Sequence, residues 1–124
     1  MFIIDEETGD ATTRQGDTWN ITVSGISDDW TVYYSVYEKD TRNIVFEIPT
    51  TPVNGDSTFF ISAENSNKLT VPEGKKTEKY YWGIKRCKGE IEDTVIIGNK
   101  DVGDLNLLLV YPLIVEGTEN NGEG

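Results

Sequence analysis

Carboxylates are the most abundant side chains in this sequence that could perform chemistry. Acidic residues outnumber basic ones by 22 to 11, and they gather near 28–29, 90–93 and 101–104. A glycosidase needs two carboxyl groups at a defined separation across a cleft, and no spacing here predicts such a pair. Calcium prefers several oxygen ligands in one loop, but Lys100 interrupts the run at 99–104, which does not follow the EF-hand pattern. The clusters are typical of solvated turns, so we expect no metal and no cofactor.

Nucleophilic catalysis has little support in the sequence. There is no His, which removes the commonest general base and every Ser–His or Cys–His pair. The single Cys, Cys87, lies between Arg86 and Lys88. Successive strand residues point to opposite faces, so these cations need not lie beside its thiol, and we interpret Cys87 as a structural residue. No glycine-rich phosphate loop is present, and we predict that the protein is not an enzyme.

Aromatic residues offer a different kind of site. Tyr33, Tyr37 and Tyr81 alternate with residues expected in the core, which predicts that they lie on the opposite, outward faces. Amphipathic rings in an exposed strip could stack on sugars, which makes carbohydrate binding an alternative function. Ordinary cross-strand pairing would explain the same three residues without any ligand.

Two segments with strict alternation predict the centre of the fold. Every second position of 30–36 and of 80–84 is large and apolar, so each segment would place a broad apolar stripe on one face of a sheet. The segment at 44–48 has the same pattern and follows a short polar connection. The residues expected to be mostly buried are Trp30, Val32, Tyr34, Val36, Ile44, Phe46, Tyr80, Trp82 and Ile84.

Short strands separated by Gly, Asn, Asp and Pro turns predict an all-β protein. We expect a single antiparallel β-sandwich of about seven to eight strands over residues 12–116. Residues 1–11 would form a flexible arm or a short edge strand, and the apolar-free segment 117–124 a disordered tail. The segment 63–67 is compatible with one helical turn or with a loop. The strands are expected at 19–23, 30–38, 44–48, 57–62, 78–87, 91–97 and 105–111.

The excess of acidic residues limits the kinds of molecule that the protein could bind. A net charge of −11 argues against nucleic acid and against an anionic membrane surface. No apolar run approaches the roughly 20 residues of a membrane helix, and the N-terminus lacks the pattern of a signal peptide. One Cys allows no disulfide within this sequence, which fits a reducing compartment. These features favour a protein that folds in a reducing cytoplasm and whose partner presents a basic surface.

Several motifs together resemble a known family. They are RQGDTW at 14–19, VYYSVY at 32–37, LTVPEG at 69–74, YYWGI at 80–84 and TVIIG at 94–98. Their order is similar to that in the immunoglobulin-like N-terminal domain of phage upper baseplate proteins and in small prophage tail proteins of Gram-positive bacteria. The resemblance implies an immunoglobulin-like sandwich and a non-enzymatic structural role in a tail or baseplate particle. It implies that the partners are other tail or baseplate proteins or further copies of the chain. It also implies a protein made in the bacterial cytoplasm without a signal peptide and then associated with the virion.

The last predicted strand is the best candidate for an interface. Its residues at 105–111 are almost continuously apolar, so both of its faces need cover. Leu108 and Val110 lie opposite Leu105, Leu107 and Leu109, and we expect that pair to contact a partner through an edge strand or an uncovered face. The alternative is that residues 1–4, or the segment near 69–71, already cover them.

Overall fold

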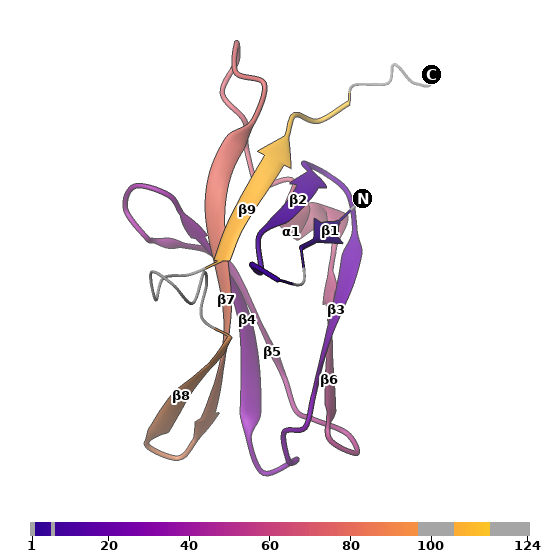
Figure 1. The fold of residues 1–124 in the computed structure, drawn as a ribbon, viewed down its shortest axis with the longest axis vertical. Coiled ribbons are helices and arrows are strands. Elements are labelled where there is room, and N and C mark those ends of the chain that lie inside the picture. The colour runs from indigo at the N-terminus through magenta and orange to yellow at the C-terminus, as the bar shows by residue number, and fades with distance from the viewer. Residues whose placement is uncertain (1, 6, 97–105, 115–124) are drawn as a thin grey trace.

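The computed structural model describes residues 2–5, 7–96 and 106–114, and all structural statements refer to these. These described residues contain nine strands and one short helix (Figure 1). The elements are β1 (Ile3–Ile4), β2 (Ala11–Arg14), β3 (Trp19–Ser24), β4 (Thr31–Glu38), β5 (Ile44–Thr50), β6 (Asp56–Ile61), α1 (Ala63–Ser66), β7 (Glu78–Lys88), β8 (Ile91–Ile96) and β9 (Asn106–Tyr111). The prediction of an all-β protein is confirmed. No described helix combines the length and apolar character needed to cross a membrane.

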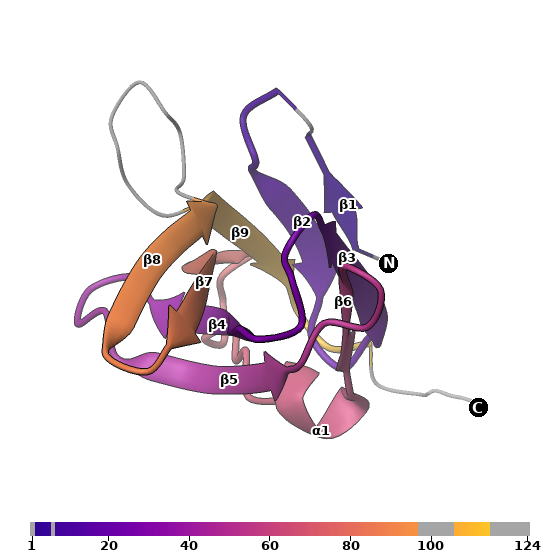
Figure 2. The ribbon, with the colours of Figure 1, turned by 90° about the horizontal axis from the view of Figure 1, so that it is seen from below.

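The strands form two sheets that face each other across the core (Figures 1 and 2). The large sheet has the order β1-β2-β9-β7-β4-β5, with β8 also paired to β7, and the small sheet contains β3 and β6. All pairs are antiparallel except β2–β9, which is parallel. The large sheet is therefore mixed, whereas the sequence predicted a purely antiparallel arrangement.

β7 is the central strand of 11 residues, and it has neighbouring strands on both sides. β4 pairs with it over eight positions, from Tyr80 to Cys87. On the other side β9 pairs with its first half and β8 with its second half, so the change of neighbour falls near Gly83. Because three strands pair directly with β7, this strand fixes the order of the others.

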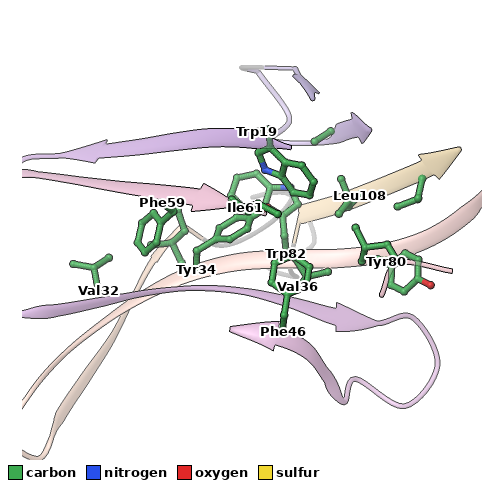
Figure 3. Close-up of a cluster of buried hydrophobic side chains, with 14 of the residues drawn as sticks. Trp19, Val32, Tyr34, Val36, Phe46, Phe59, Ile61, Tyr80, Trp82 and Leu108 are labelled. Atoms are coloured by element: carbon green, nitrogen blue, oxygen red, sulfur yellow. The ribbon is translucent and has the colours of Figure 1, made fainter. Parts of the chain in front are cut away.

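The core lies between the inner face of the large sheet and the β3–β6 pair (Figure 3). Trp82 is opposite Val36, and Ile84 is opposite Tyr34, so the two predicted stripes meet. The Tyr34 ring lies 5.7 Å from that of Trp82. The predicted core residues confirmed as buried are Val32, Tyr34, Val36, Phe46, Tyr80, Trp82 and Ile84.

Two residues of that prediction differ from the structure. Ile44 is 53% exposed, because a bulge between Val36 and Tyr37 breaks the alternation of β5. Phe46 remains opposite inward-facing Val36, but Ile44 becomes the partner of outward-facing Tyr37. Trp30 is only half-buried, and it lies against the guanidinium of Arg86 at 4.3 Å from the ring centroid.

The segment after β6 packs against the core and the start of β7. The alternative of a helical turn is the one observed, since Ser62 caps α1 by accepting a hydrogen bond from the Asn65 N–H at 3.2 Å. Leu69 is fully buried. The Tyr80 hydroxyl donates a hydrogen bond to the Thr70 carbonyl at 2.6 Å, which holds this segment against the start of β7.

The β1 arm belongs to the sheet rather than standing free. Ile3 and Ile4 pair with Thr12 and Ala11, which corresponds to the short edge strand that the sequence left as one option. The ring of Phe2 stacks on Trp19 with centroids 5.0 Å apart. The tail predicted at 117–124 lies outside the described residues.

Trp82→Ala should lower the free energy of unfolding by about 3–5 kcal/mol, as other large-to-small core substitutions do. Trp82 is 1% exposed, and its indole N–H also donates to the Gly9 carbonyl at 3.2 Å. Chemical denaturation measures the change. Phe60→Ala serves as the control, because Phe60 is 57% exposed and its truncation should cost far less. Equal effects of the two substitutions would contradict this description of the core.

Candidate functional site

β9, the strand expected to form an interface, turns the predicted interface residues toward the core and the opposite set of side chains toward the surface. Leu108 and Val110 are both 0% exposed and belong to the core. They point inward because β9 lies between β2 and β7, where alternate residues face the small sheet. The expected interface at Leu108 and Val110 is therefore corrected, since neither side chain can reach a partner. Leu107 and Leu109 face outward and are half-buried.

The outward residues of β9 continue an apolar surface across its neighbours. Leu109 is opposite Thr12 on β2, and Thr12 is opposite Ile3 on β1. Ile3 is 58% exposed. A hollow of about 390 Å³ lies here, and its apolar lining includes Ile3, Leu107 and Leu109. We call Ile3, Leu107 and Leu109 the outer apolar patch.

A tight turn between β1 and β2 positions this patch. Gly9 has φ of +80°, and an added Cβ would lie 2.4 Å from the Asn106 side-chain oxygen. A residue larger than Gly would therefore be both strained and crowded. The next residue, Asp10, accepts a hydrogen bond from the Leu107 N–H at 3.2 Å. The turn thus links the arm directly to β9.

The three tyrosines of the carbohydrate hypothesis share the outer face of the large sheet. Tyr37 and Tyr81 are directly opposite each other on β4 and β7, while Tyr33 lies further along β4 opposite Lys85. All three are half-buried. The Arg42 guanidinium lies 4.4 Å from the centroid of the Tyr81 ring. One face of that ring is therefore covered by a cation rather than open to a sugar.

Arg42 reaches this position through an uncommon backbone conformation. Its φ is +62°, in the left-handed region that favours Gly or Asn. The Arg42 N–H donates to the Glu38 carbonyl at 3.1 Å, which closes the β4–β5 turn. The contact of Arg42 with Tyr81 could not be predicted from the sequence, because it depends on this turn geometry.

The acidic clusters are engaged in surface ion pairs at the β7–β8 end. Lys85 contacts Glu92 at 3.1 Å, and Arg86 contacts Asp93 at 3.0 Å. The hydrogen bond to Glu92 raises the pKa of Lys85. Within the described ranges no three His, Cys, Asp or Glu residues gather as a metal site would require. The cluster predicted at 101–104 lies outside those ranges.

The neighbouring turn carries a further ionic contact. Asp29 accepts hydrogen bonds from the Ser27 hydroxyl and, at 3.2 Å, from Lys88. Both hydrogen bonds lower the pKa of the Asp29 carboxyl, and the bond from Ser27 has the larger effect. Lys88 also lies 5.1 Å from the Trp30 ring centroid. Cys87 on the same strand is half-buried.

A second, more polar hollow of about 390 Å³ lies between the β4–β5 turn and the segment before β7. Glu78 lies in its wall, 3.5 Å from Lys75 and 3.9 Å from Lys39. The Lys79 backbone N–H and these cations lower the pKa of Glu78. Sequence reasoning missed this hollow, because its charged residues come from separate segments with no shared motif.

No family model, curated protein or solved structure matches this chain. The candidate sites are therefore judged on their own geometry. Of the surfaces described above, the outer apolar patch has the features of a protein contact, because it combines exposed apolar side chains with a hollow beside them.

The two faces of β9 should differ sharply in stability measurements. Leu108→Ala should cost about 2–5 kcal/mol, because it leaves a cavity in the core. Leu109→Ala, on the outward face of the same strand, should cost only about 1 kcal/mol. Urea denaturation of the two variants provides the comparison. The assignment of faces would be refuted if Leu109→Ala proved the more damaging substitution.

Proposed function

We propose that the protein is a non-enzymatic interaction module of a phage or prophage tail or baseplate particle, and that it binds another protein of that particle. The observation that carries the interaction role is the outer apolar patch, where Ile3 is 58% exposed beside Leu107 and Leu109. The phage setting is supported by the resemblance of the segments at 14–19, 32–37, 69–74, 80–84 and 94–98. The absence of His and of a paired nucleophile and base in the sequence supports a role without catalysis.

We also propose that the fold is an immunoglobulin-like sandwich. In variable-type domains an additional strand extends the sheet formed by strands C, F and G. The order β9-β7-β4-β5 is compatible with G-F-C-C′, and the facing β3–β6 pair with strands B and E. Such domains often carry a Tyr near the start of strand F whose hydroxyl bonds the backbone upstream. Tyr80 near the start of β7, bonded to the Thr70 carbonyl, supports that correspondence.

An acidic surface suits such a subunit before assembly. Repulsion between copies with a net charge of −11 favours solubility. Among the described residues, the hollow beside the outer apolar patch is lined by Asp5 and Asp10 and by no Lys or Arg. A partner that supplies apolar side chains flanked by basic residues would match both features.

Co-expression with the proteins encoded beside this chain, followed by purification through a single tag, tests the proposal. We expect recovery of a tail or baseplate component, and Leu109→Asp should weaken that recovery because it places a charge in the patch. The control is Ile91→Asp, which changes an exposed apolar residue of β8 that lies away from the patch. A genomic setting without phage genes, or failure to recover such a component, would overturn the proposal.

Carbohydrate binding is the second candidate, favoured by the direct pairing of Tyr37 with Tyr81. Because Arg42 covers the Tyr81 ring, Arg42→Ala should increase binding of host-wall glycans, whereas Tyr81→Ala should abolish it. Glycan-array measurements on both variants provide the test. Binding that neither substitution changes would rule out this pair as the platform.

A further inference from the structure

Most outer strands of the two sheets have features that discourage pairing with another chain. Short length, Pro, charged residues and bulges all protect a strand edge. β1 has two residues, β5 contains Pro49, and β8 carries Glu92 and Asp93. On β6, the backbone of Asp56 is already bonded to Val53 in both directions, at 2.8 and 3.0 Å.

β3 has none of these protective features. It contains six residues without Pro or charge, in a chain in which 27% of residues are charged. It pairs with β6 in unbroken register, and no described strand pairs with its other edge. The β3 edge is thus the longest unprotected backbone edge among the described residues.

The register shows which backbone groups this edge presents. The Gly25 N–H donates to the Gly55 carbonyl at 2.8 Å, which makes these opposed residues a hydrogen-bonded pair. Hydrogen-bonded and non-bonded pairs alternate along antiparallel strands. Thr22 and Thr58 therefore form a non-bonded pair, consistent with the 3.0 Å contact between their hydroxyls. The N–H and C=O groups of Asn20, Thr22 and Ser24 must then point away from β6, toward the open edge.

The side chains of the edge are symmetric about its middle. Asn20, Thr22 and Ser24 are exposed and polar, whereas Ile21 and Val23 are half-buried against the core. Reading from Thr22 in either direction gives an apolar residue followed by a polar one. An antiparallel second copy centred on Thr22 would therefore place polar residues opposite polar ones and Ile21 opposite Val23.

We propose that β3 pairs with β3 of a second copy of this chain and forms a two-fold symmetric dimer. Thr22 would exchange both backbone hydrogen bonds with Thr22 of the second copy, and Asn20 would do so with Ser24. The result is a continuous four-stranded sheet in the order β6-β3-β3-β6. Two-fold dimers require such a self-complementary surface. The proposal is independent of the phage setting, because it uses only the edge of the small sheet.

Charge makes the dimer sensitive to salt. The pairing edge is uncharged, so like charges do not meet at the contact itself. Each copy nevertheless carries −11, and the long-range repulsion between copies is screened by ions. Pairing of one strand gives a small interface, so the equilibrium should be weak and concentration-dependent. Added salt should strengthen it.

Sedimentation equilibrium of the full chain over a range of protein and salt concentrations tests the proposal. We expect a monomer–dimer equilibrium that shifts toward dimer as salt increases. Thr22→Lys should abolish the dimer, because the two-fold axis would bring both new charges together. Thr58→Lys is the matched control: it loses the same Thr22–Thr58 contact but lies one strand away from the edge. A monomer under all conditions, or a dimer that persists in Thr22→Lys, would overturn the proposal.

Crosslinking tests the register separately. Hydrogen-bonded antiparallel pairs have Cα atoms about 5.5 Å apart, which is within the range of a disulfide. In a Cys87→Ser background, Thr22→Cys should form a covalent dimer on mild oxidation, whereas Thr58→Cys should remain monomeric. Equal crosslinking at both positions would refute the register. Failure of the unmodified chain to capture a tail or baseplate component, with an intact dimer, would instead contradict only the proposed function, since the patch residue Leu109 lies on the other sheet.

Discussion

The alternation of large apolar residues along β7 is the constraint on which the rest of the structure depends. Trp82 and Ile84 face inward while β4 pairs with one side of the strand and β9 and β8 share the other. A shift of one residue would turn this whole set to solvent. The register of β4 follows from the same requirement, because Val36 and Tyr34 must meet Trp82 and Ile84. The arm is tied to β7 as well, through the hydrogen bond from Trp82 to Gly9.

The two sheets differ in size, and each of them carries one of the two proposed contacts, the outer apolar patch or the β3 edge. The large sheet is anchored through its middle strand, whereas the small sheet consists of β3 and β6 alone. In a two-stranded sheet about half of the backbone groups point outward, away from the partner strand, and an isolated pair is marginally stable without packing. Burial of Trp19, Phe59 and Ile61 against the large sheet holds the pair in place. The strand pair can therefore expose an edge without losing its position.

The sequence predicted elements whose pattern is local, and it failed where the deciding contact is distant. Alternation in 30–37 and 80–87 identified the central strands and most of the core. The predicted burial of Ile44 was wrong because one bulge residue turns the side chains beyond it to the opposite face of β5. The alternation of residue types in the sequence does not reveal where a bulge occurs. The parallel β2–β9 pair joins residues about a hundred positions apart. Nothing in either segment alone indicates that direction.

The candidate site shows the same limit. A strand that is apolar at nearly every position does not reveal which face is inward, so Leu108 and Val110 were assigned to the wrong one. The alternation of residues could predict that Tyr37 and Tyr81 lie on the same face of the sheet. It could not predict that Arg42 covers the Tyr81 ring, because that contact depends on the conformation of the β4–β5 turn. Faces of a sheet become predictable only when the neighbours on both sides are known.

The proposed contacts are compatible with each other because they use different sheets. The outer apolar patch lies on β1 and β9 of the large sheet, whereas the open edge lies on β3 of the small one. Pairing through β3 uses the backbone of the small sheet and none of the side chains of the patch. A two-fold dimer would therefore keep two identical patches available. Such a unit could join two copies of a partner, and its avidity would exceed the affinity of one patch if the geometry allowed both to bind together.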